Sequence, residues 1–213
     1  MPIYNGIEFI NESIPSIILQ TYNKWELIVG INGHAKNSEI YKIAKNYENV
    51  DARIKVYDFY TIKGKSNTLN EMINYCKYDR VALLDVDDIW HYKKLEVQIK
   101  YLNNYDVIGS NCVWFCDMEG IIPKIPENDF SDFNFSLVNP IINSSSIIKK
   151  ELCYWNENGI EDYDLWLTLR KQNKKFYNCP EILVKHRIHK TSAFNSKGNN
   201  NKVNSLLKLH NLN

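Results

Sequence analysis

The first half of the chain alternates short apolar runs with stretches of helical spacing. Apolar residues recur every three or four positions between Ile7 and Tyr22, after a turn signal at Asn5-Gly6, and predict a helix there. Further helices are predicted at 38–47 and 66–76, with Ser66 as the N-cap of the latter. Strands are predicted at 25–31, 54–57 and 80–84, and residues 1–4 have the pattern of a strand end. This alternation predicts an α/β domain with a mostly parallel central sheet and helices on both faces.

The second half of the chain has a less regular pattern. It predicts a helix at 92–103, one or two strands within 106–116, a surface loop at 119–135, a helix that begins at Glu161, and short strands at 175–177 and 182–184. Beyond Ser196 the chain is rich in Lys, Asn and Gly, which is typical of a loose polar segment, with a short amphipathic piece at 206–209. We therefore expect one domain over residues 1–195 and a polar C-terminal tail over 196–213.

Composition narrows the class of protein. The chain has 213 residues, enough to bury a full core, and a net charge of +1, which excludes a general basic field that would attract nucleic acid. No apolar stretch approaches the ~20 residues needed to form a transmembrane segment, and we expect no signal peptide before Met1. The five Cys are scattered and odd in number, which indicates reduced thiols. We expect a cytoplasmic protein that reaches a membrane only through a partner, and homo-oligomer formation stays open.

The candidate chemistry begins at Asp85-Val86-Asp87-Asp88, directly after the apolar run 81–84. In an extended backbone, side chains alternate between faces, so Asp85 and Asp87 project one way and Val86 and Asp88 the other. Two adjacent carboxylates repel each other unless a proton or a cation lies between them. Oxygen ligands at the end of a buried strand suit Mg²⁺ or Mn²⁺, with coordination positions left for phosphates. The alternative is a solvated turn that caps the next helix.

Polar side chains also follow two other predicted strands. Asn5 comes after the strand end at 1–4, Asn32 after the strand at 25–31, and Asp85 after the strand at 80–84. Ligands of open parallel sheets bind beyond the carboxyl ends of the strands. We therefore expect these three side chains to lie at one ligand site.

Five segments, in order along the chain, resemble the motifs of the family 2 glycosyltransferases. They are residues 2–6, 20–28, 85–90, 161–167 and 187–189. The resemblance runs from Met1 to about Phe194 and implies the Rossmann-like GT-A fold. It implies transfer of a sugar from a nucleoside-diphosphate sugar to an acceptor hydroxyl, with inversion at the anomeric centre and with Mn²⁺ or Mg²⁺ as cofactor. The domain would then divide into a nucleotide-binding half, 1–104, and an acceptor-side half, 105–195.

Carried over position by position, the resemblance implies a role for individual residues. Asp85 would contact the ribose or a metal-bound water, and Asp87 would ligate the metal on the diphosphate. Asp162 would be the general base, Glu161 would orient it, and His189 would reach the metal or the diphosphate. The remaining nucleotide contacts would come from the strand ends, namely Pro2, Tyr4, Asn5 and Val86.

The chain departs from the family pattern at three places. Asn32 stands where many relatives carry an acid, and its amide can both donate and accept hydrogen bonds to the nucleotide. Residues 65–70 resemble the Lys-rich version found in processive synthases, which makes Lys65 the candidate phosphate or base contact and adds Asn70 to the nucleotide site. The loop 153–159 is short, and Trp155 in it is the best candidate to stack on a sugar ring.

The leading hypothesis is an inverting, metal-dependent glycosyltransferase with a UDP-linked sugar favoured as donor and an unidentified glycan, lipid or protein acceptor. A catalytically inactive nucleotide-sugar-binding module is the alternative, because the acid at position 32 is missing and the 153–159 loop is short. A nucleotidyltransferase ranks last, because 2–7 is not a glycine-rich basic phosphate loop. Each of three residues also has a purely structural explanation: stabilisation of the helix dipole for Asp162, packing of a loop for His189, and a solvated surface charge for Lys65.

Overall fold

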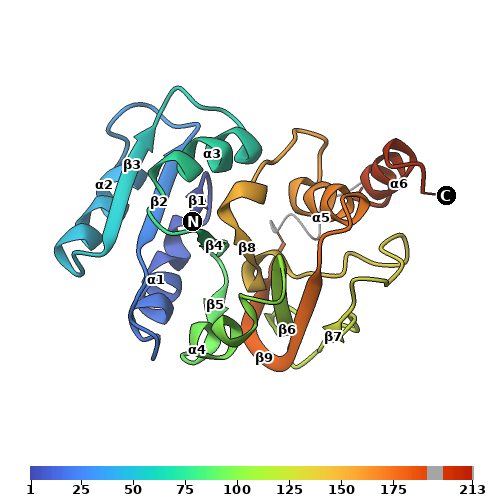
Figure 1. The fold of residues 1–213 in the computed structure, drawn as a ribbon. Helices are drawn as coiled ribbons and strands as arrows, with labels where there is room; N and C mark the ends of the chain where they lie inside the picture. Colours follow the sequence, from blue (N-terminus) through green and yellow to red (C-terminus); the bar gives the residue numbers. More distant parts are fainter. Residues whose placement is uncertain (191–198, 213) are drawn as a thin grey trace.

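The computed structural model describes residues 1–190 and 199–212, which form two β-sheets side by side (Figure 1). The N-terminal sheet is parallel, with β1 (Pro2–Ile3), β2 (Leu27–Asn32) and β3 (Ile54–Phe59) in the order β1-β2-β3. Helices α1 (Ile10–Ile18) and α2 (Glu39–Lys45) pack against one face of this sheet, since Ile14 and Ala44 share a cluster with Val29 and Ile31. Helix α3 (Lys65–Met72) covers the other face, where Met72 packs on Ile28 and Phe59.

The second sheet is mixed. Its strands are β4 (Arg80–Ala82), β8 (Ile147–Lys149), β6 (Val107–Cys116), β9 (Phe176–Ile188) and β5 (Ile89–Trp90), in that order, and β7 (Asn128–Asp129) pairs with β9. Only β6 and β9 run parallel, and the other pairs are antiparallel. The helices of this half are α4 (Lys94–Gln98), α5 (Glu161–Lys171) and α6 (Asn199–Leu209). The α/β class is confirmed, while the parallel arrangement holds for β1–β3 and for the β6–β9 pair.

Short 3-10 helices extend or replace several predicted helical turns. They are Ile7–Phe9, Asn46–Asn49, Ile73–Tyr75 and Ile99–Tyr101, and two further 3-10 helices, Asn143–Ser145 and Lys150–Leu152, lie where no helix is predicted. Ser38 caps α2 by accepting a hydrogen bond from the Tyr41 amide at 3.3 Å. The N-cap predicted at Ser66 is wrong: Gly64 precedes α3, and the Ser66 hydroxyl instead donates to the Asn156 carbonyl at 2.8 Å. The Ser66 hydroxyl, which local spacing assigned to the helix cap, is therefore used in a contact with a loop that is distant in the sequence.

The long strand β9 corrects the prediction of two short strands. Its register with β6 moves from Cys179 opposite Ser110 to Ile182 opposite Asn111, so two residues bulge out. Pro180 lies in this bulge, where a residue without an amide hydrogen is tolerated. Its carbonyl accepts a hydrogen bond from the Asn111 side chain at 3.0 Å. The segments predicted as two short strands are therefore parts of one strand with a bulge at Pro180.

The C-terminal segment predicted as a polar tail contributes a helix to the fold. Leu206 of α6 is 2% exposed and packs in the same cluster as Trp166 and Leu169 of α5, and Figure 1 shows the two helices side by side. The proposed boundary at 195/196, and the loose segment expected just beyond Ser196, fall in residues 191–198, outside the described residues. The loop at 119–135 also carries core residues, since Phe130 and Phe135 are buried.

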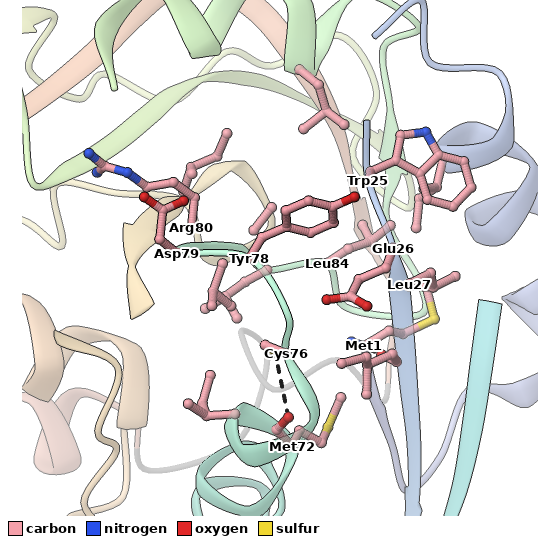
Figure 2. Close-up of a pocket in the computed structure, with 18 of the residues that line it drawn as sticks. Met1, Trp25, Glu26, Leu27, Met72, Cys76, Tyr78, Asp79, Arg80 and Leu84 are labelled. Atoms are coloured by element: carbon pink, nitrogen blue, oxygen red, sulfur yellow. Dashed lines mark hydrogen bonds between the residues drawn. The ribbon is translucent and has the colours of Figure 1, made fainter. Parts of the chain in front are cut away.

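An apolar cavity of about 210 Å³ lies where the edge strands of the two sheets face each other (Figure 2). Met1, Leu27 and Ile28 line it on the β1–β2 side, and 80–84 line it on the β4 side. Its charged lining residues are Lys24, Glu26, Asp79 and Arg80. Of the predicted site residues, Trp155 lines this cavity, but none of the residues predicted to bind nucleotide or metal does, so the cavity is distinct from the candidate active site.

Lys94 is a buried cation in the second half of the fold. It is 0% exposed, its Nζ donates to Gln98 Oε1 at 2.7 Å, and it lies 4.1 Å from the Trp90 ring centroid. Among residues 1–190 and 199–212 no carboxylate forms an ion pair with it, and burial lowers its pKa to about 7. In the unfolded chain the Lys94 amine stays protonated up to about pH 10.5, whereas in the folded protein it loses its proton near pH 7. The free energy of unfolding therefore decreases as the pH falls from 10.5 towards 7.

We expect Lys94→Met to stabilise the protein by roughly 1–3 kcal/mol at pH 7, the relief of desolvation less the cost of leaving the Gln98 oxygen without its donor. The gain in stability should shrink as the pH rises to 9.5, because removing the proton from Lys94 on folding costs less free energy at higher pH. Urea unfolding at pH 6.5, 8 and 9.5 measures this, with the exposed Lys100→Met on the same segment as control. Equal pH slopes for wild type and Lys94→Met would show that Lys94 carries no such penalty.

Candidate active site

A cleft of about 920 Å³ opens at the carboxyl ends of β1, β2 and β4. It brings together most of the residues predicted for nucleotide and metal, which are Pro2, Tyr4, Asn5, Asn32, Lys65, Asp85, Val86, Asp87 and His189. His186, which is not among the predicted site residues, also lines the cleft. Asn70, Glu161 and Asp162 are not among its lining residues. We call the part of the cleft around Lys65, Asp85, Asp87 and His189 the charged end, and the part around Tyr4 and the amide of Asn32 the neutral end; Glu8 and Lys63 line the cleft as well.

At the charged end, Asp87 faces His189 across 3.0 Å between Oδ2 and Nε2. Burial, and then the negative charges of Asp88 and Asp85, raise the pKa of Asp87. Asp88 is 1% exposed and accepts hydrogen bonds from the Arg187 amide at 2.9 Å and from His186 Nδ1 at 3.0 Å. Burial alone would lower the pKa of His186, but the Asp88 carboxylate raises it to about 9. The end of β9 thus holds the acidic segment in place.

Lys65, the first residue of α3, joins the cleft to helix α5. Its Nζ lies 2.8 Å from Asp85 Oδ1 and 3.0 Å from Glu161 Oε1. Burial opposes these charges, yet the two carboxylates raise the pKa of Lys65 well above 10.5. Burial would likewise raise the pKa of Asp85, but Lys65 and a 2.9 Å hydrogen bond from Asn143 bring it below its usual value. Lys65 is therefore held by an ion-pair network and is not an isolated solvated charge.

Asp162 follows Glu161 in the first turn of α5. Its carboxylate accepts a hydrogen bond from Asn139 Nδ2 at 3.1 Å. Burial and the neighbouring Glu161 charge raise the pKa of Asp162 to about 6, although Lys65 and Asn139 act in the opposite direction. A carboxylate with a pKa near neutrality is suited to accept a proton at physiological pH.

The neutral end of the cleft carries an aromatic ring and a buried amide. The Tyr4 ring is 56% exposed and stacks on His34 with 5.3 Å between centroids. Gly33 allows this arrangement, because a Cβ at its φ of +74° would lie 2.7 Å from the Tyr4 ring. Asn32 is 3% exposed, lines the cleft, and its side chain has no hydrogen-bond partner among the described residues. This end can therefore stack and read a planar, uncharged group.

Two predicted contacts have different surroundings in the structure. Asn70 uses its amide on the backbone of Trp155, donating to the carbonyl at 2.8 Å and accepting from the amide at 2.9 Å. Trp155 is 1% exposed within the core, so its proposed stacking on a sugar is wrong. Sequence reasoning also missed Asn139 and Asn143, since both lie in an irregular segment without a periodic signal.

The charged end of the cleft carries some of the donor atoms that a divalent cation needs. Within the part of the chain that the structure describes, no three His, Cys, Asp or Glu side chains cluster as a complete metal site. The Asp87 carboxylate and the His189 imidazole, which are adjacent in the cleft, form a partial donor set of the kind that leaves positions for substrate phosphates. The residues present therefore fit a cation that is bound together with a diphosphate.

Comparison with known proteins identifies the family. The model of the family described as Glycosyl transferase family 2 matches residues 1–147. The chain belongs to this family. An O-antigen biosynthesis glycosyltransferase of Escherichia coli, WbnJ, is 31% identical over 204 residues, which cover 91% of this chain and 80% of WbnJ. The E. coli UDP-Glc:alpha-D-GlcNAc-diphosphoundecaprenol beta-1,3-glucosyltransferase WfgD is 30% identical over 212 residues, with 92% and 79% coverage.

Solved structures agree with the fold of this glycosyltransferase. Staphylococcus aureus TarS 1-349 in complex with UDP-GlcNAc superposes with a TM-score of 0.76 at 17% identity, covering 98% of this chain and 64% of that one. A mannosyltransferase of Pyrobaculum calidifontis in complex with GDP-Man and Mn²⁺ gives a TM-score of 0.69 at 14% identity, with 90% and 56% coverage. The chain thus spans less than two thirds of these structures. The expected GT-A fold is confirmed.

No helix among residues 1–190 and 199–212 has the length and apolar character needed to cross a bilayer.

Proposed function

We propose that this family 2 glycosyltransferase moves a sugar from a UDP-sugar to an acceptor hydroxyl with inversion of the anomeric centre. The observation that carries the proposal is the Lys65 bridge, which ties Asp85 of the charged cleft to Glu161, the neighbour of Asp162. The diphosphate end of the cleft and the proposed base thereby belong to one electrostatic network. The two halves proposed for the domain, 1–104 and 105–195, meet through this bridge.

The charged end would bind the donor's diphosphate and stabilise it as the leaving group. Lys65 and protonated His186 place positive charge in the cleft, and His186 keeps its proton at neutral pH because its pKa is about 9. A divalent cation held by Asp87 and His189 would neutralise the phosphate charge as a Lewis acid. Without such cations, Asp85 and Asp87 would repel the diphosphate.

Asp162 would accept the proton of the acceptor hydroxyl. In a single displacement, the acceptor oxygen forms the new bond to the anomeric carbon as the bond to the diphosphate breaks, so the configuration inverts. The proton passes to Asp162, whose raised pKa keeps it basic enough for this transfer. Glu161 would keep Lys65 in place through their ion pair and raise the basicity of its neighbour.

The neutral end supports uracil as the base. The amide NH₂ can donate to O4 of uracil and the amide oxygen can accept from N3–H, whereas guanine adds a further donor, N2–H, beside its O6 acceptor and N1–H donor, and a single amide leaves that donor without an acceptor. Asn32 would make these contacts, with Tyr4 as the stacking surface and Pro2 and Asn5 beside it. The name of WfgD gives UDP-Glc as its donor, and the TarS structure contains UDP-GlcNAc, which also supports a UDP-sugar.

A donor panel tests the proposal. With Mn²⁺ and a mixture of simple sugar acceptors, we expect nucleotide release from UDP-Glc or UDP-GlcNAc and at least about tenfold less from GDP-mannose, since the loss of a matched hydrogen bond costs ~1–2 kcal/mol. Asn32→Asp should reduce this preference, because a carboxylate accepts from both guanine donors. The exposed Asn37→Asp serves as control. Metal-dependent binding without release from any donor would instead indicate the inactive nucleotide-sugar-binding module.

The cellular location is also a proposal. Cys76, Cys112, Cys116, Cys153 and Cys179 are all free. Free thiols in this number favour a reducing compartment such as the cytoplasm. The acceptor would then be presented on the cytoplasmic side.

A further inference from the structure

Asp164 connects three parts of the chain behind the proposed base. It is 1% exposed, and its Oδ2 accepts hydrogen bonds from Asn156 at 2.8 Å and from Asn158 at 3.2 Å. Its Oδ1 lies 2.6 Å from His210 Nε2, directly after helix α6. One buried carboxylate therefore holds the loop before α5 on one side and the C-terminal segment on the other.

The loop held by Asp164 leads into the first turn of α5. Ile160 is the N-cap residue of α5, and its apolar side chain cannot accept a hydrogen bond from the first-turn amides, so the N-cap residue makes no side-chain capping bond. The loop instead folds back on the helix through Asn156 and Asn158, and Glu161 and Asp162 follow directly. The position of these two acids thus depends on contacts made one turn further along the same helix.

The same loop is tied to α3, which carries Lys65. Ser66 Oγ donates to the Asn156 carbonyl at 2.8 Å, and Asn70 pairs with the backbone of Trp155. Asn67 Nδ2 donates to Glu157 Oε1 at 2.5 Å. Loop 155–158 is therefore held between α3 and Asp164, and the first residue of α3, Lys65, forms the ion pair with Glu161.

We propose that Asp164 is a positioning residue for Asp162, and that His210 makes the C-terminal helix part of this device. The inference rests on the proposed function, because it assigns a purpose to the placement of the base. Asp164 itself has no contact with the cleft, and it acts through the loop 156–158 and the first turn of α5. The C-terminal helix α6, which lies in the segment predicted as a polar tail, would then be needed for catalysis although it does not line the donor cleft.

The contacts predict which kinetic constant responds. Asp85 keeps its hydrogen bond from Asn143, and Asp87 keeps its contact with His189, when Asp164 is changed. The affinity for UDP should therefore persist while the base becomes misplaced. Small displacements of a catalytic group cost large factors in rate, so turnover should fall on the order of 10- to 100-fold.

The experiment compares Asp164→Asn, His210→Leu and His210→Gln in the full chain. UDP binding with Mn²⁺ is measured by calorimetry, nucleotide release from UDP-Glc and UDP-GlcNAc gives kcat, and hydrogen exchange reports on 153–162. We expect Asp164→Asn and His210→Leu to lower kcat at least about tenfold, to keep the UDP Kd within threefold, and to speed exchange at 153–162. His210→Gln, whose amide can still donate to Asp164, should recover most of the turnover.

The control is Asp132→Asn, which removes an exposed carboxylate 3.8 Å from Arg170 at the far end of the same helix and should change nothing. A variant that is merely unstable would lose UDP-binding stoichiometry in proportion to kcat, and that result would overturn the proposal. Unchanged exchange at 153–162 in Asp164→Asn would also overturn it, even if the wild type released no nucleotide. Absence of release by the wild type, with faster exchange in the variants, would count against the proposed function while leaving the positioning contact supported.

Discussion

Replacing Asp162 with Asn is expected to lower kcat by about 10²- to 10⁴-fold, the usual contribution of a general base, while UDP still binds with Mn²⁺. The side chain keeps its size and its neighbour Asn139, so the loss reflects the missing basic oxygen and not a change of fold. Nucleotide release from the best UDP-sugar under saturating donor measures kcat. Turnover within twofold of wild type would show that another group takes the proton.

The pH profile gives an independent check on the same residue. Because burial and Glu161 raise the pKa of Asp162 to about 6, the wild-type kcat should rise about tenfold per pH unit below 6 and level off above 7. Glu161→Gln removes a neighbouring negative charge, so the rising limb should move to lower pH. A limb that moves to higher pH in this variant would contradict the assignment.

Replacing Asp87 with Asn is expected to weaken UDP binding in Mn²⁺ on the order of 100-fold, because the contact of a carboxylate with a bound cation contributes several kcal/mol. The wild type should bind UDP more tightly with Mn²⁺ than with EDTA, and the variant should show little difference between the two. Calorimetric titration measures both, and it requires no acceptor.

The matched control for Asp87 is Asp117→Asn. Asp117 is an exposed acid whose backbone amide donates a hydrogen bond to the carbonyl of Ile188, the residue before His189. The variant therefore removes a negative charge near the cleft without changing Asp87 or His189. Its UDP affinity should equal that of wild type. If Asp87→Asn retained the full Mn²⁺ effect, the cation would have to bind through other residues.

The parts of the site that could be predicted from the sequence follow from local rules. Branched apolar runs located β2, β3 and β4. Asn5 and Asn32 meet because β1 and β2 are parallel, as predicted, whereas Asp85 reaches the same cleft from β4, an edge strand of the second sheet that is antiparallel to β8. The acids of the first turn of α5 were also visible in sequence. Their roles stay proposals until the variants above are measured.

The remaining features depend on contacts between segments distant in sequence. Asn70 looked like a ligand contact because its neighbours matched a motif, yet its amide pairs with Trp155, 85 residues away. Residues 175–177 and 182–184, predicted as two strands, belong to one strand with a bulge between them, and the Lys/Asn composition before Leu206 hid a helix that packs on α5. Neither periodicity nor composition reports which distant partner satisfies a buried polar group.

A crystal structure of the chain with UDP and Mn²⁺ tests the central claim most directly. The account predicts the diphosphate and the cation between Asp87, His189 and Lys65, with uracil on Tyr4 and against Asn32, and with Asp162 open to the place where the sugar would lie. A nucleotide bound outside this cleft, for example in the apolar cavity between β2 and β4, or an Asp162 carboxylate turned away from the diphosphate, would contradict it.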